Sequence, residues 1–413
     1  MASSLPRAER SAITYRAEKF RAVFTGVLET AQTTFLLLIA VGWFHAGPTA
    51  KALLVAGQSI GLICGPLVVN LTQRRRWPIA HAAAGIVALG ALGMALTLAD
   101  PRVSVFVAGS MLATFAMAAI VPLMTQVFHE NYPAASRGKL FSRAFMVRIA
   151  VAVVFSYVGG WVLARDMGNF RWLLGAFTLA LGGACFCLTR IPSLPLAASA
   201  SMHPLRAFRH MRDDRLFRQV LISWMLMGFG NLITLPLRIE YLANPAHGVS
   251  LSPDQIAFVC GVVPNLARLV VTPFCGMAFD RMNFFTMRAA LNVGFAVSIL
   301  AFFTSNTMPG LIAGAILFGV SVAGGDVAWS LWVTKLAPSH HVADYMSIHA
   351  MLTGVRGIAA PLIAFHAIAH YSLVNVGWFC VGLILLGNLA LLPEILASRS
   401  LQPAAGPMED LPE

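Results

Sequence analysis

The chain has 413 residues, of which 58% are hydrophobic and only 11% carry a charge. Soluble domains carry about 25% charged residues, so this composition excludes an ordinary soluble protein and indicates a bilayer as the solvent. The formal net charge of +12 could suggest a nucleic-acid partner. The positions of the basic residues along the chain account for that charge in another way, as described below.

Apolar runs that are long enough to cross a bilayer recur along the chain. A spanning helix needs about 20 mostly apolar residues, and no alternating strand pattern of a membrane barrel is present. We predict twelve spanning helices, at residues 22–44, 49–71, 79–99, 103–126, 141–164, 172–190, 217–238, 255–278, 289–305, 310–334, 347–369 and 374–397. The predicted fold class is therefore an all-α integral membrane protein.

A polar and basic segment at residues 191–216 divides the chain near its midpoint. The six spans before it and the six after it have similar spacing, which indicates two related halves. We predict a six-helix bundle at 22–190 and a second at 217–397. The remaining segments are an N-terminal segment at 1–21, the central loop at 191–216 and a polar tail at 398–413, for which no function is assigned.

Lys and Arg are distributed unevenly between the two sides of the predicted membrane. The side that carries both termini has 21 of them, and three more lie within helices. The opposite side has five, which are Lys51, Arg102, Arg165, Arg171 and Arg238. Basic loops stay in the cytoplasm. This bias predicts cytoplasmic termini, a multi-pass protein of the cell (inner) membrane, and a net charge that reflects topology.

A short motif between the eighth and ninth spans, GMAFDRM at residues 276–282, resembles the signature of the major facilitator superfamily. The resemblance extends over about residues 20–397. It implies twelve helices in two pseudo-symmetric halves, transport by alternating access, a monomer, and a cytoplasmic latch made by Gly276, Asp280 and Arg281. The matching position in the first half reads GPLVVNLTQRRRW, which has the basic cluster but no Asp before it.

Five ionisable residues lie well inside the predicted spans, where a charge needs a partner or a cavity. They are Glu29, Arg148, Arg268, Asp326 and Arg356. The resemblance implies that Glu29 pairs with Arg148 and that Asp326 pairs with Arg356. Arg268 then has no acid left, so we expect it to face water, a carbonyl group or an anionic substrate. The alternative is that Arg268 connects the two halves.

Other side chains complete the predicted substrate and proton pathway. Gln32, Asn231 and Asn265 are polar residues within spans. Trp329 follows Asp326 by three residues, so the two lie on a similar helix face. An aromatic residue near a helix end serves as an interfacial anchor as often as it stacks on a ligand.

These features predict a transporter of a small organic solute, coupled to protons through Glu29 or Asp326. Three interior arginines against two acids give a slight preference for an anionic substrate. The alternatives are an uncoupled facilitator or exchanger, a multidrug-type exporter, a membrane receptor and a membrane-embedded enzyme. HExxH is absent, and so is a P-loop for a nucleotide. We expect no enzymatic activity, no cofactor, no metal and no nucleic-acid partner; the predicted partners are the solute, protons and the lipid bilayer.

Overall fold

The computed structural model describes residues 6–133, 137–195, 211–247, 249–336 and 342–400, and the regular structure within them is helical. Twelve helices in this part of the chain are long and apolar enough to cross a membrane. This result confirms the twelve predicted spans and the all-α fold class. The chain is a multi-pass membrane protein.

The helices form two groups of six spans. The N-half contains α1 (Arg7–Thr30), η2 (Ala31–Phe35), α2 (Leu36–Gly42), α3 (Pro48–Arg74), α4 (Ile79–Ala99), α5 (Val103–Ala119), α6 (Val121–Asn131), α7 (Arg137–Arg165), η4 (Met167–Asn169) and α8 (Phe170–Thr189). The C-half contains α10 (Arg215–Ala243), η5 (Pro245–His247), α11 (Pro253–Ala257), η6 (Phe258–Val262), α12 (Val263–Arg281), α13 (Phe284–Phe303), α14 (Met308–Leu336), α15 (Val342–Ala367) and α16 (Leu373–Ser400).

The helix ends differ from the predictions in ways that affect the site. α1 begins at Arg7, so most of the N-terminal segment is helix continuous with the first span. α10 continues to Ala243 and carries Arg238 and Glu240 inside a helix. Much of the central loop, residues 196–210, and most of the tail, residues 401–413, lie outside the described residues.

Large apolar side chains cover the outside of the molecule. Trp172 is 77% exposed, Leu179 is 76% exposed and Leu67 is 69% exposed. Exposed apolar groups on this scale are unfavourable in water and favourable against lipid chains. The surface therefore agrees with the hydropathy of the spans.

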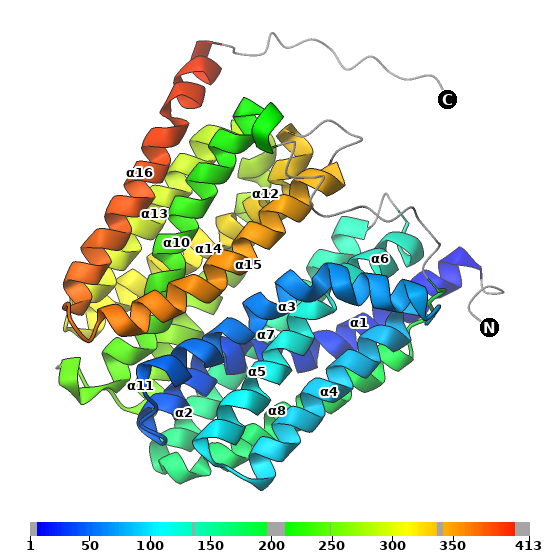
Figure 1. The fold of residues 1–413 in the computed structure, drawn as a ribbon, viewed down its shortest axis with the longest axis horizontal. Helices are drawn as coiled ribbons and strands as arrows, with labels where there is room; N and C mark the ends of the chain where they lie inside the picture. The colour runs from blue at the N-terminus through cyan, green and yellow to red at the C-terminus, as the bar shows by residue number, and fades with distance from the viewer. Residues whose placement is uncertain (1–5, 134–136, 196–210, 248, 337–341, 401–413) are drawn as a thin grey trace.

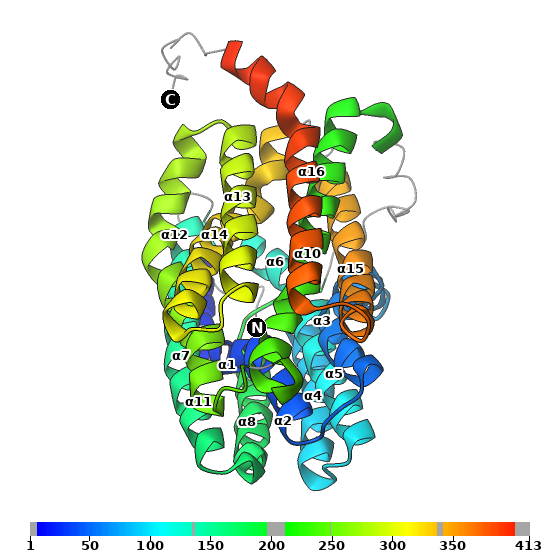
Figure 2. The same ribbon diagram turned by 90° about the vertical axis from the view of Figure 1, so that its left-hand side faces the viewer.

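The two halves meet at one face of the molecule and separate toward the other (Figures 1 and 2). We call the face where α1 begins and α16 ends the terminal face. The opposite face, which carries the connections at residues 43–47, 244–252 and 368–372, is the distal face. Figure 2 shows α11 beside the N-half helix α7, near the distal face, and the two elements are in contact.

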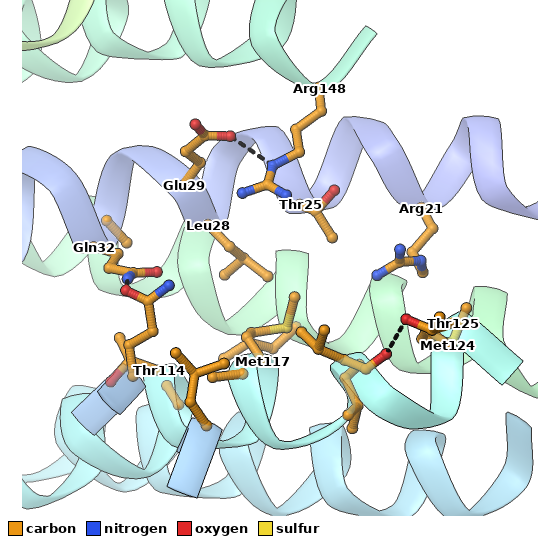
Figure 3. A pocket seen from close by; sticks show the side chains of 18 of the residues that line it. Arg21, Thr25, Leu28, Glu29, Gln32, Thr114, Met117, Met124, Thr125 and Arg148 are labelled. Carbon is orange, nitrogen blue, oxygen red and sulfur yellow. Dashed lines mark hydrogen bonds and ion pairs between the residues drawn. The ribbon is translucent and has the colours of Figure 1, made fainter. Parts of the chain in front are cut away.

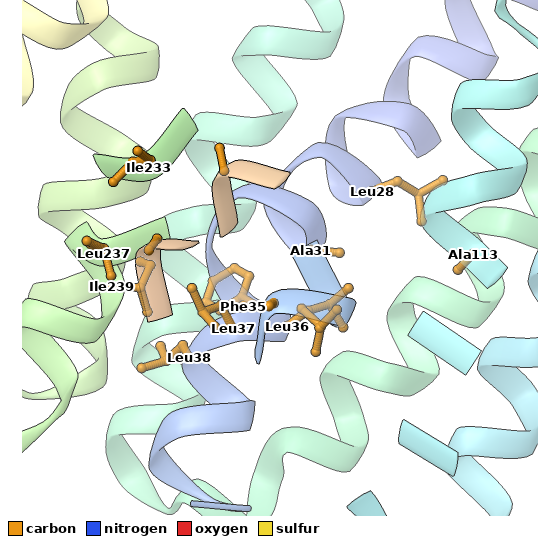
Figure 4. Packing of buried hydrophobic residues seen from close by; sticks show 14 of the residues in the cluster. Leu28, Ala31, Phe35, Leu36, Leu37, Leu38, Ala113, Ile233, Leu237 and Ile239 are labelled. Carbon is orange, nitrogen blue, oxygen red and sulfur yellow. The ribbon is translucent and has the colours of Figure 1, made fainter. Parts of the chain in front are cut away.

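Close backbone approach joins the halves on the distal side. A Cβ atom added at Gly357 of α15 would overlap Oγ of Ser59 on α3, and one at Gly160 of α7 would lie 2.5 Å from Cβ of Ala257. Figure 4 shows Leu37 and Leu38 of α2 packed near Leu237 of α10. Small residues permit such helix contacts in membranes because lipid supplies little drive for association.

Candidate functional site

A cavity of about 690 Å³ lies within the N-half and is lined by residues of α1, η2, α2, α3, α4, α5, α6, α7 and α8, with Trp329 from the C-half. Its polar lining comprises Arg21, Thr25, Glu29, Gln32, Gln58, Thr114, Thr125 and Arg148. Aliphatic, methionine and aromatic side chains form the rest. Figure 3 shows Glu29 between Gln32 and Arg21 along α1, with Arg148 facing Glu29. A concave site with a few polar groups among apolar ones is typical of small-molecule binding.

Glu29 is the most heavily paired acid in the cavity wall. Nε of Arg148 donates to Oε2 of Glu29 at 2.5 Å, and NH1 of Arg268 donates to Oε1 at 2.6 Å. The Glu29 side chain is 8% exposed. The pairing with Arg148, within the N-half, confirms the prediction. The second contact comes from α12, so it joins the two halves.

Arg268 also binds Asp326 on α14. Its Nε and NH2 atoms each lie 2.8 Å from Oδ2 of Asp326. The guanidinium stands over the ring of Phe145, 5.0 Å from the ring centroid. Arg268 is thus shared by one carboxylate from each half, which matches the alternative prediction that it connects them.

The predicted pair of Asp326 with Arg356 was wrong. Asp326 binds Arg268, and NH1 of Arg356 donates to the carbonyl oxygen of Trp224 on α10. Arg356 packs against Gly228 of α10, where an added Cβ atom would overlap NH1 of the guanidinium. The glycine lets the Arg356 guanidinium approach α10, so it turns into the C-half interior. The expectation that Arg268 lacks an acid was wrong for the same reason.

Two π-helical segments stand beside this network. η2 begins two residues after Glu29, and η6 ends six residues before Arg268. The segments touch each other, and a Cβ atom at Gly261 of η6 would lie 3.7 Å from Oγ1 of Thr34 in η2. A π-bulge rotates the residues that follow it relative to a regular helix and is frequent at functional sites. Hydropathy carries no signal for such a bulge.

The other predicted pathway residues divide into two groups. Gln32 and Trp329 line the cavity, and the Gln32 side-chain amide donates to that of Gln58. Asn231 donates to Sδ of Met227 at 2.9 Å, and Asn265 donates to the Gly261 carbonyl oxygen at 3.0 Å. Those two amides bond to residues four positions earlier in the chain and are not among the cavity-lining residues.

The predicted latch falls at the end of α12. The helix ends at Arg281, as expected for a motif at a helix terminus. The surroundings of Gly276 and the side chains of Asp280 and Arg281 are not among the described parts of the structure, so the latch stays a prediction.

A second ion pair joins the halves near the distal face. Nζ of Lys51 on α3 lies 2.6 and 2.7 Å from the two carboxylate oxygens of Glu240 on α10. Both residues are buried. Asn244 also donates to Oε1 of Glu240 at 2.8 Å. We call Lys51 and Glu240 the distal pair.

Sequence reasoning missed the distal pair because it placed Glu240 in the loop after the seventh span and counted Lys51, near the start of the second span, among the basic residues on the side opposite the termini. Arg238, the last residue of the seventh predicted span, was counted on that side too, but it is buried and donates to Oγ of Ser298 at 2.9 Å. The signal that could have found them was the spacing of Arg238 and Glu240 directly after an apolar run. A helix extended by one turn places such charges at the bilayer edge, where they need partners.

Comparison with solved structures identifies the architecture. The chain is similar to a mutant of the nucleoside transporter NupG, with 14% identity, a TM-score of 0.76, and coverage of 92% of this chain and 99% of that one. It is similar to a D-xylose-proton symporter, with 15% identity, a TM-score of 0.66, and coverage of 92% and 95%. It is also similar to a POT family transporter in complex with a thioalcohol-conjugated peptide, with 12% identity, a TM-score of 0.71, and coverage of 94% and 96%.

The chain has the major facilitator fold. No family model and no curated protein sequence matches it. Within this fold, the cavity lies in the N-half. Arg268 connects the halves in the interior, and the distal pair connects them near the distal face.

Breaking the distal pair is expected to open the distal face. Lys51→Met leaves Glu240 buried without a cation, which costs about 3–5 kcal/mol in the closed arrangement. We expect Val55→Cys, one turn along α3, to react with a membrane-impermeant maleimide roughly two orders of magnitude faster in this background. The measurement uses a chain whose native cysteines are replaced by alanine.

Arg102→Met is the matched control, because Arg102 pairs with Asp100 on the exposed distal surface. It should leave the labelling rate unchanged. Equal rates in the Lys51→Met variant and the parent would contradict a gate at the distal pair.

The distal pair also predicts a pH effect through His247. Its Nε2 atom lies 3.9 Å from Oε1 of Glu240, and burial lowers the pKa of His247 below 6.5, opposed by Glu240. An open distal face returns this pKa toward its ordinary value, so the open form binds protons more readily. Distal closure is therefore fully stable above about pH 6.5 and weakens as the pH falls through the lowered pKa.

We expect maleimide labelling of Val55→Cys to accelerate on acidification below about pH 6.5, and His247→Gln to remove that acceleration. The rates are corrected for the pH dependence of the thiol with a free cysteine peptide. His370→Gln, an exposed histidine on the same face, is the control. The same acceleration in the His247→Gln variant would contradict the assignment.

Proposed function

We propose that this protein is a secondary transporter that moves a small organic solute across the cell membrane by alternating access. The observation that carries the proposal is the shared guanidinium of Arg268, which joins Glu29 of the N-half to Asp326 of the C-half beside a cavity. Ionisable groups within a membrane are costly and are typical of transport pathways. The similar structures are of transporters for nucleosides, D-xylose with protons, and peptides, and they support the same class here.

The proposed orientation places the terminal face in the cytoplasm. Of the five basic residues predicted for the distal side, Lys51 and Arg238 are buried, which leaves Arg102, Arg165 and Arg171 exposed. The bias toward the terminal side in the sequence count supports cytoplasmic termini. In this orientation the separation of the halves faces the cytoplasm, and the distal pair closes the outside.

The cavity lining favours a solute that combines hydrogen-bonding groups with an apolar surface. The Gln32 and Gln58 amides and the hydroxyls of Thr114 and Thr125 supply donors and acceptors, while Trp329 supplies an aromatic face. The slight preference for an anion rested on three interior arginines against two acids, which left Arg268 without an acid. Arg356 lies away from the cavity lining, and the Arg148, Glu29, Arg268 and Asp326 charges balance, so we propose recognition through hydrogen bonds and shape.

Proton coupling is assigned to Asp326. Its side chain is 41% exposed, whereas that of Glu29 is 8% exposed and lies between two guanidinium groups. A proton that neutralises Asp326 leaves Arg268 held by Glu29 alone, which strengthens the connection between the halves. Loss of the proton returns Arg268 to both carboxylates. The charge on one exposed carboxylate thereby changes how firmly α12 is tied to α1.

The second candidate is an exchanger without a proton step. The observation that favours it is the double pairing of Glu29, whose carboxylate is held between the guanidinium groups of Arg148 and Arg268. In that case Arg268 and Asp326 hold helix positions, and solute binding alone drives the alternation.

The test begins with nucleosides, pentoses and dipeptides as probes in a thermal-stability screen, because a ligand of the folded state raises the melting temperature. A stabilising probe is then followed in proteoliposomes. A gradient of one pH unit is worth about 1.4 kcal/mol per proton, or about tenfold accumulation. We expect Asp326→Asn to abolish this accumulation while exchange at equal pH persists, and Glu29→Gln to impair both.

Asp100→Asn is the matched control, because Asp100 is a partly exposed acid on the distal face that pairs with Arg102; it should accumulate solute like the parent. Unchanged accumulation by the Asp326→Asn variant would exclude its role in coupling. An absence of pH-driven accumulation in the parent, with exchange intact, would select the exchanger.

A further inference from the structure

A second cluster of charged and aromatic side chains lies inside the C-half, apart from the cavity. It consists of Arg288 of α13, Arg356 and His349 of α15, Trp332 of α14 and Trp224 of α10, and we call it the cationic cluster. Arg288 is 1% exposed, His349 is 0% exposed and Arg356 is 9% exposed. The guanidinium carbon of Arg288 lies 3.4 Å from the centroid of the Trp224 ring. The His349 ring lies 5.1 Å from both indole rings.

The cationic cluster contains many donors without acceptors. Within the described chain, Nε, NH1 and NH2 of Arg288, Nε of Arg356 and the indole Nε1 atoms of Trp224 and Trp332 have no hydrogen-bond partner. Both ring nitrogens of His349 also have no hydrogen-bond partner within the described chain. Guanidinium and indole groups can only donate. A buried set of donors that lacks acceptors is the complement of an anion.

Charge leads to the same conclusion. The acid Asp214, at the start of α10, accepts from the Tyr345 hydroxyl at 2.7 Å and from the Phe217 amide at 3.0 Å. The described structure shows no ion pair of Arg288 or Arg356 with a carboxylate. Two buried guanidinium groups without counter-charge are strongly unfavourable, because each loses its hydration and gains no partner.

We propose that the cationic cluster is a binding site for a phosphate-class oxyanion. The planar guanidinium presents paired N–H groups whose spacing matches the oxygens of phosphate. A dianionic phosphate balances the two arginines, and the indole N–H groups and His349 supply further hydrogen bonds. Chloride would balance only one charge, and as a single atom it cannot accept from the paired N–H groups of a guanidinium with two separate oxygens as phosphate does.

The location of the cluster allows two sources of phosphate. Arg288 is the fifth residue of α13, which starts at the terminal face, so it lies about 6 Å along the axis from the first residue. This is the depth of lipid headgroups, and a phosphomonoester lipid could reach it. From the other direction, Trp329 lines the cavity and its ring lies 5.8 Å from that of His349, so free phosphate could enter there.

The proposal does not depend on transport, because its readout is binding. The melting temperature of purified protein in detergent is measured without phosphate, with inorganic phosphate, with sodium chloride of equal ionic strength, and with micelles that contain phosphatidic acid or phosphatidylcholine. We compare the parent with Arg288→Met and with Arg190→Met. Arg190 is the matched control, an exposed arginine whose guanidinium lies 4.7 Å from the Phe186 ring.

Inorganic phosphate or phosphatidic acid should raise the melting temperature of the parent and of Arg190→Met by at least about 2 °C. Arg288→Met should lose this rise. Without phosphate it should melt at or above the parent, because an unpaired buried charge has been replaced by an apolar side chain. A rise with phosphatidic acid alone would identify the lipid as the source, and a rise with inorganic phosphate would identify the free ion.

The proposal is overturned if neither phosphate source raises the melting temperature, or if chloride or phosphatidylcholine raises it equally. It is also overturned if Arg288→Met melts lower than the parent without phosphate and keeps the rise. Should Arg288→Met fail to fold, Trp224→Phe keeps the ring and removes one donor. This variant should show a smaller rise with phosphate, and an undiminished rise would contradict the site.

Discussion

The arrangement of the two halves depends on a guanidinium group that must satisfy its charge within a bilayer. Arg268 cannot be hydrated by lipid, so its N–H groups need acceptors from the protein. One acceptor is Glu29 from the N-half and the other is Asp326 from the C-half. Because neither half supplies both, the charge is satisfied only when the halves meet at this depth. The N-half cavity and the π-helical segments lie around this point.

The distal pair and the Arg268 network connect the halves at different depths between the distal and the terminal face. Lys51 and Glu240 join the halves near the distal face, where close glycine contacts also bring α3 and α15 together. Toward the terminal face the halves diverge, as Figure 1 shows. Closure near one face and separation at the other is the geometry that alternating access requires. Buried ion pairs suit such a function because their net stability is small and their geometry is specific.

Hydropathy and charge bias predicted the twelve spans and the two halves correctly because these follow from helix length and the bilayer. The Glu29–Arg148 pair was also predicted, since its helices are neighbours in the resembling family. The partner of Asp326 was not, because α14 neighbours both α12 and α15 and only packing decides between them. Because Gly228 has no side chain, Arg356 can pack against α10 and does not pair with Asp326. The burial of Lys51 and Arg288 was not predicted, because a charged residue near a predicted helix end is expected to lie at the membrane surface.

The most direct measurement is the distance between the halves at the terminal face. It is obtained by electron paramagnetic resonance between spin labels attached to cysteines that replace Arg75 and Met282. Both positions are exposed and lie at helix ends, one in each half. The account predicts two distance populations whose ratio changes with pH in the parent and stays constant in Arg268→Met. A pH response of equal size in Arg268→Met would show that Arg268 does not couple the halves and would contradict the central claim.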